Sequence, residues 1–167
     1  MIWKIKLLQK KHLMNLSKDF NVTPSSIEQA LLYRPSCRLE EIGSLIFDVA
    51  HNPDGFTRLF SEVVKKHPHK KICAMIGMSS DKDVKGCLSI AAKYCTHIFL
   101  VQAEGPRAAK KESMAQMLFS LGYDHHSHDQ SIESLIIKTY NDPSSIYVIC
   151  GSFYVMSRAK KALPSSL

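Results

Sequence analysis

The sequence predicts an α/β protein of the Rossmann-like class, with a mostly parallel sheet of about six strands and helices on both faces. From residue 38 onward, short apolar strand-like runs alternate with segments of helical length. Strands that alternate with such helices imply βαβ crossovers, and therefore a parallel sheet that is covered on both faces. Residues 38–42 are short and directly precede the first buried strand, which favours one added antiparallel edge strand.

The first strand–helix unit spans residues 45–67. Residues 45–50 form an apolar strand, and Asn52 and Pro53 then open a helix, Asn52 as its N-cap and Pro53 at the first position, where a missing N–H has no cost. Apolar residues recur at i, i+3, i+4, i+7 and i+8, which predicts one buried helical face. This face consists of Phe56, Leu59, Phe60, Val63 and Val64.

The same unit recurs along the rest of the chain. Further strands are predicted at 72–76, 97–101 and 145–150, and helices at about 81–95, 112–121, 131–140 and 152–162. The inward positions of the helix at 81–95 are Val84, Cys87, Leu88, Ala91 and Tyr94. Those of the helix at 112–121 are Met114, Met117, Leu118 and Leu121.

Residues 1–33 do not follow this alternation and read as two amphipathic helices. They fit either a surface-binding arm or the end of a preceding domain, and the second is favoured because the basic charge is not confined to one face. We therefore expect a helical remnant of a central domain over 1–33 and an α/β domain over 34–167.

Composition narrows the function classes. The chain has 167 residues, of which 45% are hydrophobic and 22% charged, which is ordinary for one globular domain. No apolar run reaches the length of a membrane span. Part of the net charge of +7 lies in the first twenty residues, and the rest is spread over lysine pairs that are typical of solvated surfaces. No nucleic-acid motif accompanies this charge. Five cysteines, an odd number, without a secretion signal favour a reducing compartment, the cytoplasm.

Polar residues gather where the predicted strands end. Asp48 and His51 follow the first buried strand, the run 81–83 follows the second, Arg107 follows the third, and Ser152 follows the last. In an open α/β sheet ligands bind beyond the carboxyl ends of the strands, near helix N-termini that favour phosphate or carboxylate groups.

Each of these residues also has a structural interpretation. Asp48 could cap the following turn, although an aspartate in an apolar strand is costly unless it is paired or faces a ligand. His51 could be a solvated loop residue, and the acidic residues of 81–83 suit a helix start. Histidines 125, 126 and 128 invite a metal interpretation, but their spacing is poor for one ion and a solvated loop is favoured. No metal site is predicted.

The motifs carry a family resemblance. Asp48-Val-Ala-His51-Asn52-Pro53, preceded by Arg38-Leu-Glu40 and followed by Asp81-Lys82-Asp83, resembles the C-terminal domain of folylpolyglutamate synthase/dihydrofolate synthase, in the Mur ligase superfamily. Pro106-Arg107-Ala108 and Gly151-Ser152-Phe153-Tyr154 follow at the expected distances. One departure is Ser36-Cys37-Arg38, where the family usually has Pro-Gly-Arg.

The resemblance implies an ATP-dependent ligase that phosphorylates a folate or pteroate carboxylate and joins the amine of L-glutamate to the acyl phosphate. It implies that Arg38, Asp48 and Asn52 contact ATP, and that His51 and Ser152 serve glutamate and the reacting end. Asp81, Lys82, Asp83, Arg107 and Tyr154 are implied as substrate-binding. A guanidinium suits phosphate, and an imidazole and a hydroxyl beside helix N-termini can hold a carboxylate.

One element of this chemistry is missing from the sequence. Phosphoryl transfer requires a phosphate-binding loop and Mg²⁺ ligands, and the chain contains no Gly-Lys pair and therefore no P-loop. The family carries both on a separate N-terminal domain. We therefore expect a monomeric chain that is inactive alone and needs that P-loop domain in cis or in trans.

Two alternatives come from other classes. A non-catalytic interaction module would keep the α/β scaffold without the chemistry and would tolerate loss of Arg38, Asp48 and His51. A receiver-like or flavodoxin-like domain shares the βα order, but the sequence lacks the paired acidic residues near the first strand that a receiver needs.

Overall fold

The computed structural model describes residues 23, 25–26 and 35–164. The chain divides into two units, Met1–Ser36 and Cys37–Leu167, and the helices and strands given below lie in the second. The two helices predicted within residues 1–33 fall almost wholly outside the described residues, so the assignment of that segment to a preceding domain stays a prediction.

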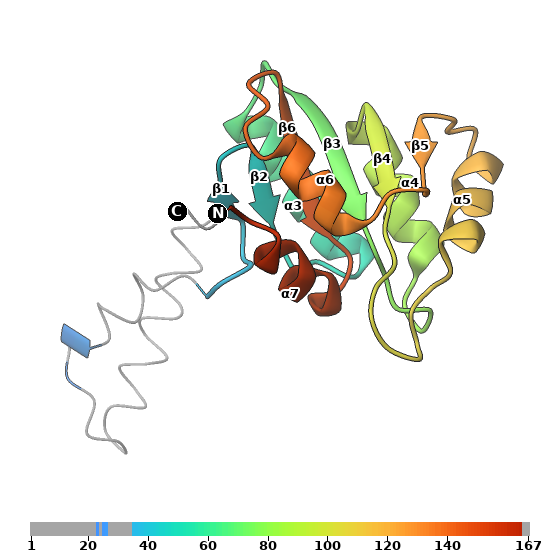
Figure 1. Cartoon of the computed structure of the whole chain (residues 1–167), viewed down its shortest axis with the longest axis horizontal. Coiled ribbons are helices and arrows are strands. Elements are labelled where there is room, and N and C mark those ends of the chain that lie inside the picture. The colour runs from blue at the N-terminus through green and yellow to red at the C-terminus, as the bar shows by residue number, and fades with distance from the viewer. Residues whose placement is uncertain (1–22, 24, 27–34, 165–167) are drawn as a thin grey trace. The chain divides into compact units, whose positions relative to one another are not determined.

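The second unit is built on one six-stranded sheet (Figure 1). Its strands are β1 (Glu40–Ile42), β2 (Leu45–Phe47), β3 (Lys71–Ile76), β4 (His97–Leu100), β5 (His126–Ser127) and β6 (Ser145–Cys150). The spatial order is β1-β2-β6-β3-β4-β5. Only the β1–β2 pair is antiparallel, and the other four pairings are parallel. The predicted fold class, including the antiparallel edge strand, is confirmed.

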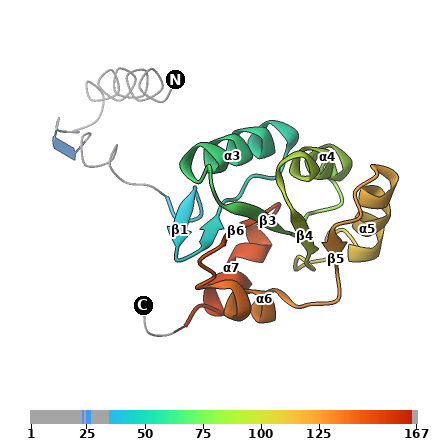
Figure 2. The same ribbon diagram turned by 90° about the horizontal axis from the view of Figure 1, so that it is seen from above.

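Helices cover both faces of the sheet (Figure 2). They are α3 (Pro53–Lys66), α4 (Val84–Tyr94), α5 (Lys111–Ser120), α6 (Ile132–Thr139) and α7 (Phe153–Lys161). One core lies between the sheet and helices α3, α4 and α5, and a second lies under α6 and α7. The two phenylalanines of α3, Phe56 and Phe60, are fully buried in the first core, and each such burial contributes about 1.5–3 kcal/mol.

Two details of the predicted cores are wrong. Val64 and Leu121 were expected to face inward, and both are partly exposed, at 38% and 36%. Val64 lies in the last turn of α3 and Leu121 is the C-cap of α5, and a side chain at a helix end has fewer neighbours to cover it. The pattern also missed β5, because this edge strand is only two residues long and polar. His126 therefore lies in a strand and is half-buried, rather than in a fully solvated loop.

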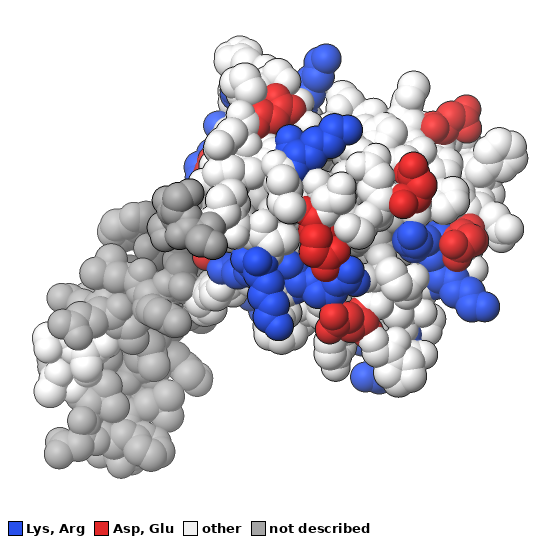
Figure 3. All heavy atoms as spheres, in the orientation of Figure 1, with Lys and Arg blue, Asp and Glu red and all other residues white. Residues whose placement is uncertain are grey.

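The charges of the described residues are mixed on the face that carries α6 and α7. Figure 3 shows Lys and Arg alternating with Asp and Glu there, without a continuous basic surface. All five cysteines are free thiols with buried side chains. No helix in the described part of the chain combines the length and the apolar character that crossing a bilayer requires.

Candidate functional site

The loops that follow four neighbouring parallel strands are joined to one another at the carboxyl edge of the sheet. The Gly151 N–H after β6 donates to the Ala50 carbonyl after β2, at 2.8 Å. The Ser80 N–H after β3 donates to the Arg107 carbonyl after β4, at 2.7 Å. The helices that start from these loops, α3, α4 and α7, direct their N-termini to the same edge. Every site residue predicted from the sequence lies on this edge or in the segment that leads into it.

Asp48 lies directly beyond β2 and is only 9% exposed. Its two carboxylate oxygens accept different backbone N–H groups, Oδ2 from Leu39 at 2.9 Å and Oδ1 from Ala50 at 2.8 Å. A charged acceptor makes such bonds stronger than neutral ones. Asp48 therefore ties the segment that carries Arg38 to the loop that carries His51.

The backbone around Arg38 adopts an unusual conformation. The residues on either side of it, Cys37 and Leu39, have φ angles of +58° and +49°, in the left-handed region that costs a residue other than glycine about 1–2 kcal/mol. Cys37 occupies the position where the resemblance led us to expect glycine, and the chain keeps the glycine-like conformation without the glycine. The Arg38 side chain is exposed.

His51 and Asn52 begin the turn into α3. The His51 side chain is exposed, and its Nδ1 lies 3.0 Å from the Val49 carbonyl oxygen. Because a carbonyl only accepts, Nδ1 carries the proton, and in the neutral ring Nε2 is then the acceptor. Asn52 caps α3 as predicted, its Oδ1 accepting from the Gly55 N–H at 2.8 Å.

The segment 81–83 combines a helix cap with an exposed ion pair. Asp83 is the N-cap of α4 and accepts from the Gly86 N–H at 2.8 Å. Lys82 and Asp81 form an exposed pair at 3.2 Å. The hydrogen bond from Lys82 holds the pKa of Asp81 below its ordinary value, and the charge of Arg107 acts in the same direction. Asp83 thus has a structural use, while Asp81, Lys82 and Arg107 present charge to solvent.

The β6 loop approaches the β3 loop so closely that side chains are excluded. Gly151 has a φ of +102°, and a Cβ there would lie 2.7 Å from the Gly77 carbonyl oxygen. Ser152 follows as the buried N-cap of α7, and its Oγ accepts from the Tyr154 N–H at 3.3 Å. Tyr154 itself is half exposed, at 50%. Ser152 is therefore buried at the edge, whereas the Tyr154 side chain is open to solvent.

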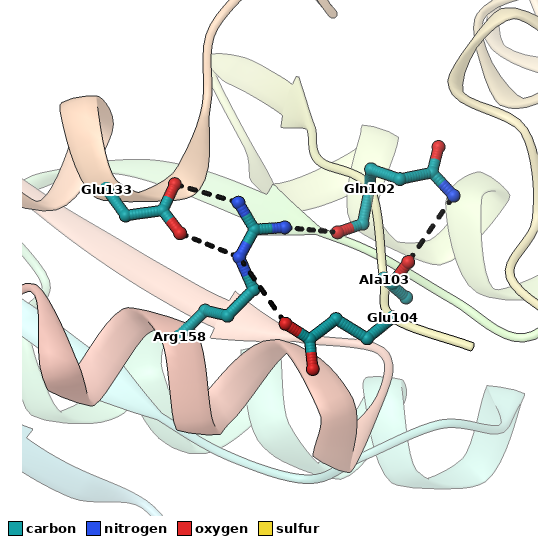
Figure 4. Close-up of polar contacts among 5 residues, drawn as sticks. All are labelled: Gln102, Ala103, Glu104, Glu133 and Arg158. Carbon is teal, nitrogen blue, oxygen red and sulfur yellow. Dashed lines mark hydrogen bonds and ion pairs between the residues drawn. The ribbon is translucent and has the colours of Figure 1, made fainter.

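One ion-pair network beside the edge was not predicted (Figure 4). Arg158 of α7 donates from Nε and one terminal nitrogen to the two oxygens of Glu133, at 2.6 and 2.9 Å, and from the other to the Gln102 carbonyl at 3.3 Å. Glu104 lies 3.8 Å from the same Nε. The network joins α7, α6 and the loop after β4. Sequence reasoning missed it because its members are far apart in the chain and sit in no motif.

The described residues contain no group of three or more His, Cys, Asp or Glu side chains arranged to hold a metal ion. A shallow hollow of about 340 Å³ lies at the opposite end of the sheet, where β3 and β6 begin. It is lined by Glu41, Gly43, Ser44, His67, Lys70, Asn141, Asp142, Ser145 and Ile146. None of the site residues predicted from the sequence contributes to it.

The fold is that of an α/β domain whose candidate site lies at the carboxyl edge of its sheet. Residues 37–153 match the family described as Mur ligase, glutamate ligase domain, and the chain belongs to that family.

The chain is also similar to named relatives. It is 26% identical over 143 residues to dihydrofolate synthase/folylpolyglutamate synthase of Escherichia coli (strain K12), a match that covers 86% of this chain and 33% of the relative. The E. coli FolC structure in complex with DHPP and ADP superimposes with a TM-score of 0.71 at 25% identity, over 84% of this chain and 34% of that one.

Two further solved structures are similar. The bifunctional enzyme of Yersinia pestis c092, complexed with AMPPNP and a Mn ion, gives a TM-score of 0.71 at 26% identity, over 84% of this chain and 34% of that one. A bifunctional enzyme with Mn, AMPPNP and L-glutamate bound gives 0.66 at 27% identity, over 85% and 36%. The chain thus spans about a third of the length of these relatives.

Proposed function

We propose that this chain is the C-terminal part of an ATP-dependent ligase that adds L-glutamate to the carboxylate of a folate or pteroate. The observation that carries the proposal is the joining of four neighbouring loops, with the family's Arg, Asp and His, at one edge of the sheet. The relatives named above bind ADP or AMPPNP, and one binds L-glutamate.

Arg38, Asp48 and Asn52 would serve the nucleotide. The exposed guanidinium of Arg38 can form a two-pronged hydrogen bond with phosphate oxygens. Each oxygen of Asp48 already accepts one backbone N–H and keeps a second lone pair for a ribose hydroxyl. Asn52 uses its Oδ1 as a helix cap, and its amide nitrogen can still donate.

His51 and Ser152 would serve glutamate and the reacting end. The Nε2 of a neutral His51 can accept a hydrogen bond from an amino group, because Nδ1 is bound to the Val49 carbonyl. Ser152, at the N-terminus of α7, lies where helix N–H groups favour a carboxylate. The exposed groups of Asp81, Lys82, Arg107 and Tyr154 would contact substrate, with Asp83 fixing the start of α4.

Mg²⁺ and the phosphate-binding loop would belong to the rest of the enzyme. Bound Mg²⁺ neutralises charge that develops on the transferred phosphoryl group. Its ligands would be supplied by the P-loop domain. The chain would therefore contribute part of the ATP and glutamate sites and lack ligase activity by itself.

The test is a titration of the isotope-labelled chain with Mg-ATP, in which the NMR chemical shifts of the backbone amides are measured at each step. We expect saturable shifts at residues 38, 48–52 and 77–83, and their loss in Arg38→Ala, which removes an exposed side chain and should leave the fold intact. Arg58→Ala, an exposed arginine on α3, is the matched control and should bind as wild type does. Flat spectra at millimolar Mg-ATP, or equal shifts in Arg38→Ala, would reject the proposed nucleotide role and favour a non-catalytic module.

A further inference from the structure

The turn that presents Arg38 is held by a side chain of the Arg38-Leu-Glu40 motif to which the resemblance assigns no role. Cys37 and Leu39 are both left-handed, and such conformations persist only where the surroundings enforce them. On the Leu39 side the enforcing group is Asp48, described above. On the Cys37 side it is Glu40, whose Oε2 accepts the Cys37 N–H at 2.7 Å.

Glu40 is itself anchored to α7. Its other carboxylate oxygen, Oε1, receives a hydrogen bond from Lys160 Nζ at 2.6 Å, and both side chains are about 70% buried, with 30% and 29% exposed. The ammonium of Lys160 also lies 5.6 Å from the centre of the Phe47 ring in β2, within range of a cation–π attraction. The carboxylate thus bridges the turn and α7, the helix that Ser152 caps.

We propose that Glu40 is a positioning residue for Arg38, and that Lys160 fixes Glu40 in the orientation that this role requires. By accepting the Cys37 N–H, Glu40 keeps Cys37 in the left-handed region and so sets the direction in which the next residue leaves the backbone. The inference rests on the proposed nucleotide role of Arg38. It adds a physical link between the nucleotide arginine and α7, and it assigns a function to a carboxylate that would not itself touch the ligand.

A purely stabilising role of Glu40 makes a different prediction. If Glu40 only strengthened the fold, glycine at position 37 would have no particular power to replace it. If Glu40 enforces a positive φ, glycine should replace it, because glycine adopts that region without steric cost. Alanine at 37 removes the thiol without relieving the φ angle, and it therefore controls for the lost side chain.

The experiment compares Mg-ATP affinity and backbone conformation in wild type, Glu40→Ala, Glu40→Gln, Cys37→Gly/Glu40→Ala and Cys37→Ala/Glu40→Ala. We expect Glu40→Ala to weaken binding on the order of tenfold, which corresponds to one hydrogen bond to a charged group. Glu40→Gln should lie between Glu40→Ala and wild type, because its amide oxygen still accepts the Cys37 N–H. The glycine double variant should recover to within about threefold of wild type, and the alanine double variant should not. Glu62→Ala, which breaks an exposed pair with Lys65 at 2.9 Å on α3, should bind as wild type.

The second readout needs no ligand. In a residue other than glycine, a strong intraresidue amide–Hα NOE marks a positive φ, and it should be present at residues 37 and 39 in wild type and weaken in Glu40→Ala. If wild type does not bind Mg-ATP, the proposed function fails and this readout alone decides the positioning role. Unchanged NOEs in Glu40→Ala, unchanged affinity in a binding-competent chain, or equal rescue by alanine and glycine would each overturn it.

Discussion

Asp48 accepts two backbone N–H groups with one carboxylate, and a substitution can show how much these hydrogen bonds contribute to stability. The donors are the N–H groups of Leu39 and Ala50, and Asp48 itself is only 9% exposed. Asparagine has nearly the same shape but offers one acceptor oxygen and one NH₂ donor, so one of the two N–H groups would face another donor. A buried donor left without a partner costs about 1–3 kcal/mol.

We therefore predict that Asp48→Asn lowers the free energy of unfolding by about 2 kcal/mol, measured by urea denaturation. Asp54→Asn, at an exposed position in the first turn of α3, serves as the control and should cost a few tenths of a kcal/mol at most. An unfolding midpoint for Asp48→Asn that equals that of wild type would show that the two N–H bonds contribute little.

Gly151 makes a second prediction at this scale. An alanine there would meet the Gly77 carbonyl oxygen at 2.7 Å and would also hold a φ of +102°. Gly105 has nearly the same φ, +99°, but nothing lies within 4 Å of its added Cβ. We expect Gly105→Ala to cost about 1–2 kcal/mol from strain alone, and Gly151→Ala to cost clearly more. Equal thermal shifts in the two variants would mean that the close approach relaxes at no cost.

The positions of single residues in the fold were predictable where a local sequence signal, such as a strand end or a helix cap, indicated them. Asp48, Asn52 and Asp83 stand at strand ends or helix starts, and the structure places them there. The anchors Lys160 and Arg158 were not predictable, because each acts on a partner that is distant in sequence. Periodicity and capping signals extend over one element only, so they cannot report such pairs.

At the scale of elements, α3 and β6 were predicted closely, since a cap and a regular apolar face define the first and an unbroken apolar run defines the second. Their observed bounds are Pro53–Lys66 and Ser145–Cys150. The strand β5 escaped because two polar residues carry no periodicity, and its pairing is set by β4 alone. The site edge was predictable from the α/β alternation, whereas the hydrogen bonds that join its loops were not.

The docking of α6 against α7 should depend on pH through Glu133. The pKa of Glu133 lies below its ordinary value of 4.5, chiefly because Arg158 donates hydrogen bonds to the carboxylate. A lowered folded-state pKa means that this stabilisation is complete above about pH 4.5 and is lost as the pH falls through the folded-state value. Because the pair is partly exposed, its contribution is on the order of 1 kcal/mol.

We predict that Glu133→Gln is less stable than wild type at pH 7, and that the difference in unfolding free energy narrows below pH 4.5. Glu104→Gln, whose carboxylate lies at 3.8 Å from Arg158, should change little at either pH. A difference between Glu133→Gln and wild type that stays constant down to pH 3 would contradict the assigned cause.

At the scale of the whole molecule, the decisive fact is that the chain spans about a third of its relatives. The motifs were sufficient to indicate the family, because residue types at fixed spacings survive at 26% identity. They could not give the strand order, in which β6 lies between β2 and β3. The buried parallel strands share the same short apolar pattern, and that pattern does not indicate which strands are neighbours.

If this chain supplies only part of the active site, we predict that it can complement a relative that lacks the matching C-terminal region. Mixed with ATP, glutamate and a folate substrate, the 167-residue chain should release no ADP by itself. Added to the E. coli relative from which the matching C-terminal region has been deleted, it should restore ADP release that depends on both substrates, and the Arg38→Ala chain should restore far less. Equal restoration by the two chains would show that the arginine is not part of the shared site.

The central place of β6 also has a consequence for how the protein is made. Its neighbours on both sides, β2 and β3, are synthesised first, yet they are not bonded to each other and leave a gap that only residues 145–150 can fill. Pairings between segments so distant in sequence form late and slowly. Until residues 145–150 have been synthesised, the nascent chain holds two unpaired strand edges beside the apolar faces of its helices, and it is then most exposed to aggregation and to chaperone binding.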